Sequence, residues 1–384
     1  MIPNLSKKSA GVYLHVPFCR SRCSYCDFAT GMYEPALADR YVRALVKEIE
    51  AFAVPADNED IDTVYLGGGT PSLLSPLQVR TILSAVNQRF KVAHDAELTM
   101  ELNPGELQLE VLQEFHRLGI NRASFGAQTF ADAELKQLGR THTADDIRQT
   151  LRHLRAAGFD NISFDLIAAL PGQKLEDWQR NLDEALALKP EHLSLYLLEV
   201  HEATPLAEQI KRGARPLPDE DLAAEMYRVM VQTVCAAGYT HYEISNFCLP
   251  GYESRHNAKY WTGAPYYGFG CSAHSFDGQG RRWANERDTA RYVEMVERAA
   301  SPVIEVTELS ENEKRAESVF LGMRMLTGIS LKDYRDRFGI DLRADHPGEI
   351  DRLSEAGLIE LDDDLLRLTA AGALLSNEIF ARLS

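Results

Sequence analysis

Three cysteines stand within eight positions near the start of the chain: Cys19, Cys23 and Cys26, in the stretch HVPFCRSRCSYCDF. Thiolates at this Cys-x3-Cys-x2-Cys spacing can converge from one loop on a compact inorganic centre, and thiolates are the ligands that iron–sulfur clusters select. A four-iron cluster usually takes four cysteines. With three, one iron lacks a protein ligand and is free to bind a substrate or cofactor. The spacing therefore predicts a cluster with one open iron.

Zinc is the main alternative occupant of this loop. Cys3His zinc sites are common, and His15 lies close to the three cysteines in the sequence. The spacing is not typical of zinc fingers, however, and no second pair of ligands follows it. Cys235, Cys248 and Cys271 are scattered, and we expect them to be small buried apolar residues.

The elements that must position the thiols alternate between short β-branched or aromatic runs and longer amphipathic segments. This alternation predicts βαβ units with right-handed crossovers around a parallel sheet, and six or so units favour a partial barrel over a flat doubly wound sheet. The expected strands are 11–16, 62–69, 97–104, 122–128, 161–167 and 192–200, and the expected helices are 36–53, 76–90, 107–118, 131–138, 144–157, 175–188 and 219–237. The fold class is therefore α/β, with the barrel over residues 1–250.

Polar residues and glycines recur at the carboxyl ends of these strands. Gly67–Thr70 follows the second strand, Glu101 and Asn103 lie in the third, Gln128 ends the fourth, and Asp165 lies in the fifth. In a parallel barrel the carboxyl ends of the strands face the ligand, so the pattern predicts one shared site with the cysteine loop.

The composition and periodicity of the sequence change after residue 250. Residues 251–300 are rich in glycine, proline and aromatic residues without periodicity, which predicts a long structured loop. Residues 301–384 are helical again and include a hairpin-like stretch at 358–369, so we expect a small, mainly helical C-terminal domain that is winged by this hairpin. The acidic turn 362–364 argues against a DNA-binding wing.

Composition excludes several classes of protein. The net charge of -16 argues against a nucleic-acid surface, which needs clustered basic residues. The first residues contain no apolar leader segment, and no stretch approaches the ~20 apolar residues of a membrane span. Six cysteines, half of them in one cluster, fit a reducing compartment. We therefore expect a cytoplasmic protein that contains no transmembrane segment and binds no nucleic acid.

With these motifs in view, the chain resembles the radical S-adenosylmethionine (SAM) superfamily, in which the open iron chelates SAM and an injected electron cleaves it to a 5′-deoxyadenosyl radical. The stretch YLHVPFC at 13–19 is similar to the oxygen-independent coproporphyrinogen III oxidase-like group within it. The resemblance continues through LGGGTPS (66–72), ELNP (101–104), SFGAQTF (124–130), FDLIAALPGQ (164–173) and YYGFGCSAHS (266–275). It implies a partial (β/α)6 barrel.

The resemblance also implies which residues contact SAM. By match to the motifs these are Tyr13, Tyr25, Gly68, Gly69, Thr70, Glu101, Gln128, Arg140 and Asp165. The residue types agree with this role, because glycines allow close backbone approach, carboxylates suit ribose hydroxyls, and the Arg140 fork suits a carboxylate. The alternatives are helix N-caps for Glu101 and Asp165 and a surface ion pair for Arg140.

A second motif, HNAKYW at 256–261, resembles the H-N-x-x-Y-W signature of the HemW heme chaperones. In that interpretation His256 supplies an axial imidazole to heme iron, Tyr260 and Trp261 pack on the macrocycle, and Asn257 holds the loop or bonds a propionate. The alternative is a histidine whose hydrogen bonds are satisfied inside a loop with two packing aromatics. Cys271 and His274 are other heme-ligand candidates.

The true oxidases carry a further cysteine two positions after the third, where this chain has Phe28. We therefore do not expect coproporphyrinogen III dehydrogenase activity, and whether the protein is an enzyme stays open. The resemblance implies a chaperone that binds heme, a [4Fe–4S] cluster and SAM and delivers heme to respiratory hemoproteins. The resemblance also implies a low-potential electron donor of the flavodoxin or ferredoxin type. It is compatible with a homodimer and with peripheral membrane association. The alternatives are a radical SAM oxidoreductase acting on a tetrapyrrole, and a zinc-stabilised barrel with a binding role.

Overall fold

The computed structural model describes residues 9–55, 60–105 and 107–383, so the first eight residues of the chain lie outside it. A 12-stranded sheet runs through most of these residues, and it is parallel from β11 through β1, β4, β5, β6 and β7 to β8. Its strands are, in spatial order, β14 (Val303–Glu308), β13 (Arg281–Asn285), β12 (His274–Phe276), β11 (Tyr266–Phe269), β1 (Ala10–Val16), β4 (Ile61–Gly68), β5 (Val92–Leu102), β6 (Arg122–Gln128), β7 (Ile162–Ala168), β8 (His192–Leu197), β10 (Asn246–Cys248) and β9 (Thr240–Glu243). Within the described residues its two edges do not pair, so the predicted partial barrel is confirmed as an open, curved sheet.

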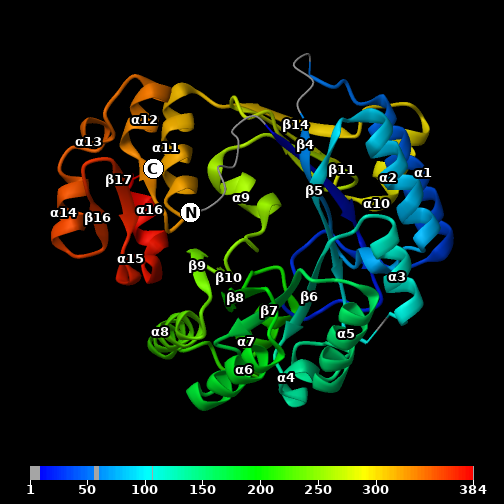
Figure 1. Ribbon diagram of the computed structural model, residues 1–384, viewed down its shortest axis with the longest axis horizontal. Helices are drawn as coiled ribbons and strands as arrows, with labels where there is room; N and C mark the ends of the chain where they lie inside the picture. The colour runs from blue at the N-terminus through cyan, green and yellow to red at the C-terminus, as the bar shows by residue number, and fades with distance from the viewer. Residues whose placement is uncertain (1–8, 56–59, 106, 384) are drawn as a thin grey trace.

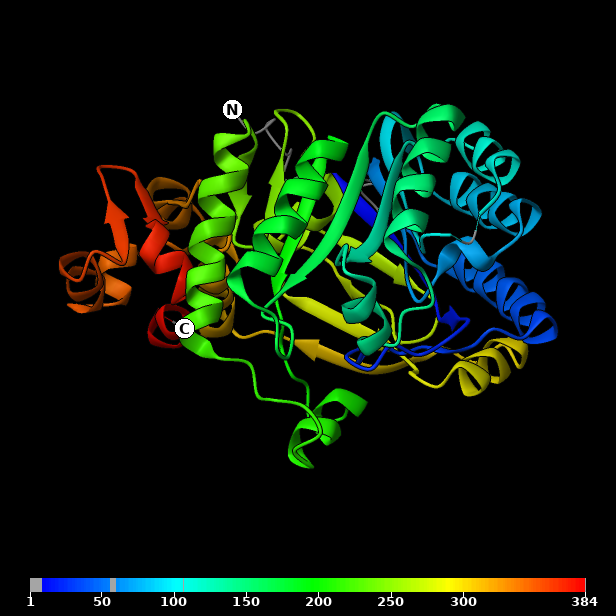
Figure 2. The ribbon, with the colours of Figure 1, turned by 90° about the horizontal axis from the view of Figure 1, so that it is seen from below.

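Helices follow the parallel strands and cover the convex side of the sheet (Figure 1). Their ends follow the local sequence: Ser75 and Gln78 form a capping box at the start of α2, and α5 ends at Gly158, whose φ of 101° is left-handed. The helices are α1 (Pro35–Ala51), α2 (Pro76–Arg89), α3 (Leu109–Arg117), α4 (Asp132–Gln137), α5 (Ala144–Ala157), α6 (Leu175–Leu188), α7 (Pro205–Lys211) and α8 (Glu220–Ala236), with a 3-10 turn at Pro71–Leu73. Figure 2 shows α7 projecting away from the others.

The two faces of the parallel strands differ in chemistry. Residues on the convex face, such as Val12, Val64 and Phe125, are buried and apolar beneath the helices. Because side chains alternate along a strand, the residues between them face the concave side. Those positions are mostly polar, and they include Thr63, Tyr65, Glu97, Thr99, Glu101, Arg122, Ser124, Ser163, Asp165, His192 and Ser194. A barrel filled by its own core has branched apolar residues there, so this concave face is suited to a ligand.

The segment 251–300 is not the long loop expected from its composition. It contains α9 (Arg255–Thr262), β11, β12, β13 and α10 (Thr289–Glu297). Its glycines misled the sequence interpretation: Gly268 lies within β11, where a Cβ atom would meet the His274 carbonyl oxygen at 2.2 Å. Glycine here marks close approach of two backbones rather than a loop.

The C-terminal part is mainly helical with a small antiparallel sheet, as expected. Its helices are α11 (Glu311–Gly322), α12 (Leu331–Phe338), α13 (Leu342–Asp345), α14 (Glu349–Glu355), α15 (Ala370–Leu374) and α16 (Ser376–Leu383), and its sheet has the order β15 (Ile329–Ser330), β17 (Leu365–Leu368), β16 (Ile359–Leu361). β16 and β17 form the expected hairpin. β14 belongs to the main sheet, and the division into parts at 250 and 300 stays a prediction. Within the described part of the chain, none of the helices is long and apolar enough to cross a membrane.

Candidate functional site

The cysteine loop leaves the carboxyl end of β1 and returns to α1. It includes a short parallel pair, β2 (Phe18–Cys19) and β3 (Gly31–Met32). The Ser24 amide donates to the Leu138 carbonyl at 2.9 Å, and the Ser24 carbonyl accepts from the Leu206 amide at 2.8 Å. The loop is thereby anchored between the end of α4 and the start of α7.

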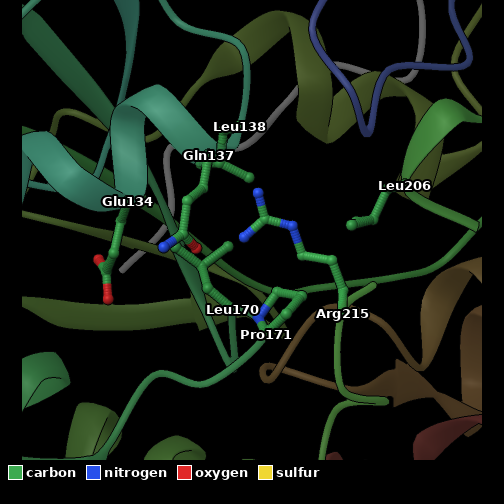
Figure 3. A pocket seen from close by; sticks show the side chains of 7 residues that line it. All are labelled: Glu134, Gln137, Leu138, Leu170, Pro171, Leu206 and Arg215. Atoms are coloured by element: carbon green, nitrogen blue, oxygen red, sulfur yellow. The ribbon is translucent and has the colours of Figure 1, made fainter. Parts of the chain in front are cut away.

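A small recess lies beside this anchor. It is lined by Glu134, Gln137, Leu138, Leu170, Pro171, Leu206 and Arg215, and Figure 3 shows the Arg215 side chain reaching toward Gln137 and Leu138. Because Leu138 and Leu206 also bond the loop at Ser24, the recess adjoins the cysteine loop. None of the expected SAM or heme residues lines it.

His15, at the end of β1, fixes the far side of the loop. Its Nε2 lies 3.0 Å from the Ala29 carbonyl oxygen, which can only accept, so Nε2 carries the proton and Nδ1 accepts from the Tyr13 hydroxyl at 3.1 Å. Burial lowers the pKa of His15, so the ring is neutral. Both ring nitrogens are therefore engaged, which leaves His15 no lone pair for zinc in this arrangement.

The three cysteines are free thiols and half-buried. Thr70 Oγ1 lies 3.8 Å from Cys19 Sγ, and Arg140 Nη1 donates to Cys23 Sγ at 3.3 Å. Burial raises the pKa of Cys19 to about 11, although the Thr70 hydrogen bond opposes this, and burial also raises the pKa of Cys26. Without a metal these two groups are thiols at neutral pH, and a bound metal centre would deprotonate them.

The cysteine arrangement bears on which centre the loop can hold. Among the described residues, no group of three or more His, Cys, Asp or Glu side chains is arranged to hold one metal ion. A mononuclear zinc ion needs its ligands around one point, whereas in a four-iron cube each cysteine binds a different iron. The donor set of the loop, three free cysteine thiols, fits a cube in which three irons each take one protein ligand.

Next to the cysteine loop, the turn after β4 brings backbone very close to β1. Gly68 has a φ of 108°, and a Cβ atom there would lie 2.5 Å from the His15 ring. At Gly69 a Cβ atom would lie 2.7 Å from the Phe18 carbonyl oxygen, and the Gly69 amide donates to the Val16 carbonyl at 2.8 Å. Only glycine fits this approach. The two glycines expected to contact SAM thus also set the distance between β4 and the cysteine loop.

Arg140 joins several elements of the site. Besides Cys23 it donates through Nη2 to Asn103 Oδ1 at 3.0 Å and to the Gly126 carbonyl at 2.9 Å. Asn103 Nδ2 in turn donates to Thr70 Oγ1 at 2.9 Å. The expectation that places Arg140, Thr70 and the cysteines in one site is thus matched by a continuous hydrogen-bonded path, and the alternative of a surface ion pair for Arg140 does not apply.

Glu101 lies on the concave face and is not a helix N-cap. Its carboxylate accepts from the Tyr65 hydroxyl at 2.7 Å and from the Gly68 amide at 3.0 Å. Burial raises the pKa of Glu101 to about 7, the charge of Asp165 adds to the rise, and the two hydrogen bonds oppose it. Glu101 can therefore change its charge near neutral pH.

The other expected SAM residues lie on the same face or beside it. Asp165 pairs with Gly126 across β7 and β6, and burial raises its pKa against a hydrogen bond from Ser194. Gln128 ends β6 with a left-handed φ of 64°, which only a few residue types adopt readily. Tyr25, within the cysteine loop itself, packs against Leu138 at the end of α4. The structure thus brings together the residues that the resemblance assigned to SAM.

Several concave-face residues were not predicted, among them Tyr65, Arg122, Ser194 and Tyr196. Arg122 is fully buried, and its charge acts on Glu101 and Asp165. Tyr196 is 41% exposed near the carboxyl end of β8, beyond the residues that pair with β10, so the concave face is open there. The signal was present in the sequence as strict polar–apolar alternation in runs such as RASFGAQ and HLSLYL, which parallel strands buried on both faces lack.

The H-N-x-x-Y-W residues lie on α9, on the inner side of the sheet (Figure 1). His256 is 1% exposed, and its Nδ1 and Nε2 bond Thr63 Oγ1 at 2.9 Å and Tyr260 Oη at 3.1 Å. Burial, with the Lys259 charge, lowers the pKa of His256 to about 3, so the ring is neutral. Trp261 packs under Arg324, and Asn257 donates its amide to Ser254 Oγ at the helix start.

The two other heme-ligand candidates belong to other elements than α9, one just after β11 and one in β12. Cys271 is buried, with its Sγ 3.7 Å from the Tyr41 hydroxyl, and His274 is exposed in β12. The structure brings neither to His256.

Comparison with known proteins agrees with this geometry. The sequence pattern of the radical SAM superfamily matches residues 13–185, and that of the HemN C-terminal domain matches residues 309–375. The heme chaperone HemW of Bacillus subtilis is 36% identical over 369 residues, which cover 96% of this chain and 97% of that protein. The chain belongs to the HemW family of radical SAM proteins.

A second HemW relative, the heme chaperone HemW of Escherichia coli, is 37% identical over 266 residues, covering 68% of this chain and 69% of that protein. Coproporphyrinogen III oxidase HemN from Escherichia coli, a radical SAM enzyme, has the same fold: its structure superposes with a TM-score of 0.85 at 23% identity, over 99% of this chain and 91% of that one. Radical SAM membership implies a [4Fe–4S] cluster and SAM, and the cysteine loop with its neighbouring polar face fits both.

Proposed function

We propose that this HemW-family protein is a heme chaperone that holds a [4Fe–4S] cluster with bound SAM, binds one heme, and delivers it to hemoproteins of the respiratory chain. The observation that carries the proposal is a full-length similarity to heme chaperones in a chain with Phe28, and not a cysteine, two positions after Cys26. The same proposal includes a cytoplasmic location, a homodimer, peripheral membrane association and an electron donor of the flavodoxin or ferredoxin type.

In this proposal Cys19, Cys23 and Cys26 ligate three irons. A bound cluster supplies an open iron for SAM and a route for one electron. Arg140 orients Cys23 through its hydrogen bond and offers its remaining donors to a carboxylate. Glu101 and Asp165 present acceptors to ribose hydroxyls, and Gly68 and Gly69 keep the backbone near enough for main-chain contacts.

His256 is the proposed axial ligand of heme iron, with Tyr260 and Trp261 against the macrocycle and Asn257 near a propionate. A neutral imidazole is the form that binds iron, and the lowered pKa of His256 keeps it neutral. Its two ring nitrogens are both bonded within the protein, so binding replaces the Nε2 contact to Tyr260.

The test is a heme titration beside a SAM-cleavage assay on anaerobically reconstituted protein. We expect the wild type to contain acid-labile sulfide, and the triple Cys→Ser variant at 19, 23 and 26 to lose it. We also expect the wild type to bind one heme per chain and His256→Ala to bind heme much more weakly. His116→Ala serves as the matched control, because His116 is exposed in the last turn of α3 and is not a heme-ligand candidate.

Conversion of coproporphyrinogen to protoporphyrinogen by the reconstituted protein would contradict the chaperone proposal. It would favour the alternative of a radical SAM oxidoreductase acting on a tetrapyrrole. Equal heme affinity of the wild type and His256→Ala would remove His256 from the assignment.

A further inference from the structure

Helix α9 holds the side chain of its own residue His256 buried against the sheet. His256 is 1% exposed, and the helix lies against the inner side of β4, where Thr63 bonds the ring. A macrocycle needs several ångströms of free space around a ring nitrogen. In the described conformation His256 has no such space, so α9 must move before any large ligand reaches it.

Charged contacts hold α9 to the sheet. The Glu97 carboxylate accepts from the Arg255 and His256 amides at 3.1 and 3.0 Å, at the positive end of the helix. Lys259 is 2% exposed, and its Nζ lies 2.6 Å from Asp62 Oδ1. A buried ion pair fixes geometry more than it adds stability, because desolvation opposes the attraction.

The C-terminal part contacts the other side of α9. The Arg324 guanidinium lies 4.3 Å from the centroid of the Trp261 ring. Arg324 is itself held by the edge of the main sheet: its carbonyl accepts from the Ile244 amide at 3.2 Å, and the Leu326 amide donates to the Tyr242 carbonyl at 3.0 Å. Figure 1 shows α9 between the sheet and α11, which precedes Arg324.

The packing at this junction is incompletely hydrogen-bonded. Among the described residues, Trp261 Nε1, Arg324 Nε, Glu243 Oε2 and Asn246 Oδ1 are buried and lack a hydrogen-bond partner. Each such atom carries a desolvation cost that a different arrangement would relieve. The closed junction is therefore held by a few contacts, several of them charged, and it contains buried polar atoms whose desolvation no hydrogen bond offsets.

We propose that α9 is a gate over His256 and that Arg324, from the C-terminal part, is the latch that keeps it closed through Trp261. The inference rests on the proposed function, because the ligand admitted is heme. Arg324 acts as a positioning residue: displacing the segment 324–326 from the sheet edge frees Trp261 and lets α9 leave the sheet. A partner that engages the C-terminal part would thereby control heme access.

The experiment compares the wild type with Arg324→Gln and with Arg281→Gln. The second variant is the matched control, because the Arg281 guanidinium also lies over a tryptophan, 5.9 Å from the Trp283 ring, but belongs to β13 and pairs with Glu308 of β14. Hydrogen exchange of the α9 amides and diethyl pyrocarbonate modification of His256, both without heme, report opening. Stopped-flow mixing with hemin reports access. Lys259→Met, which frees the sheet side, is a second opening variant if Arg324→Gln folds poorly.

We expect Arg324→Gln to raise α9 exchange, His256 modification and the hemin association rate together by about two- to thirtyfold, the range of a cation–π contact. Arg281→Gln should match the wild type. An unchanged exchange rate in both opening variants overturns the gate. Faster exchange of the α9 amides with an unchanged hemin association rate would also overturn the gate. In either case, heme binding that still depends on His256 would leave the proposed function standing. If no variant binds hemin, the proposed function itself fails.

Discussion

Arg140 Nη1 donates a hydrogen bond to Cys23 Sγ at 3.3 Å, although 117 residues separate the two in the chain. The same guanidinium bonds Asn103 and the Gly126 carbonyl, so a residue after α4 ties the cysteine loop to β5 and β6. One arginine thus joins a cysteine of the loop to two strands of the concave face.

Replacing Arg140 should therefore affect both cofactors. We expect Arg140→Gln to retain less than half of the iron and sulfide and to bind SAM at least ~10-fold more weakly, since a charged hydrogen bond is worth about 1.5–3 kcal/mol. Assays of iron and acid-labile sulfide measure the cluster content, and equilibrium dialysis measures the affinity for SAM. Arg148→Gln is the control, because Arg148 pairs with Asp145 and Glu184 on α5 and α6. Wild-type SAM affinity in Arg140→Gln would refute the assignment.

The glycine turn after β4 offers a steric test. A Cβ atom at Gly69 would push on the Phe18 backbone at 2.7 Å and displace Cys19, whereas one at Gly31, in the same cysteine loop, meets nothing within 4 Å. We expect Gly69→Ala to cost about 1–3 kcal/mol of unfolding free energy and most of the cluster. Gly31→Ala should keep the wild-type unfolding free energy and the wild-type cluster content. Chemical denaturation and the cluster absorbance are the measurements, and equal cluster content in the two variants would contradict the prediction.

Glu101 should make SAM binding depend on pH. Its pKa of about 7 means that it is protonated below neutrality and then loses its charge as an acceptor for ribose hydroxyls. We expect SAM affinity to fall as pH drops from 8 to 6, and Glu101→Gln to bind weakly with a flat profile over that range. Equilibrium dialysis at several pH values measures both, and a wild-type profile that stays flat would exclude Glu101 from the site.

Glu48 on α1 provides a separate pH dependence, of stability. Its carboxylate accepts from the Gly270 amide, Asn285 and Tyr292, and burial raises its pKa from 4.5 to about 7. A carboxyl with a raised folded pKa binds its proton more tightly when folded, so its contribution is present below pH 4.5 and is lost as pH rises through 7.

We therefore expect the unfolding free energy of the wild type to decline over that window by up to roughly 3 kcal/mol on account of Glu48, and Glu48→Gln to remove this decline. Urea unfolding at several pH values measures it. Glu50→Gln, an exposed change on the same helix, should retain the wild-type slope. A steeper decline in Glu48→Gln than in the wild type would show the sign to be wrong.

Much of the barrel could be predicted because periodicity and helix-end signals are local. The strand at 122–128 and the helices at 144–157 and 175–188 have the expected bounds, and glycine at 158 and a capping box at 143–146 account for the ends of one of them. The spacing of the three cysteines is a local signal of the same kind, and the cluster that it predicts is also implied by radical SAM membership.

What the sequence could not predict depends on contacts between distant segments. The partners of Arg140, the burial of His256 under its own helix and the contact of Arg324 with Trp261 all join residues whose separation carries no local signal. β11 was missed because Gly268 looks like a loop residue until the neighbouring backbone of β12 is present.

The parallel pairing of β1 with β11 also has a consequence for biosynthesis. One edge of the first strand has no neighbour until residues 266–269 have left the ribosome, although its other edge can pair with β4 much earlier. During that interval the nascent chain presents an unpaired strand edge next to three free thiols, a state prone to aggregation. A fragment that stops at residue 250, in which β1 lacks its β11 neighbour, should therefore be far less soluble than the whole chain.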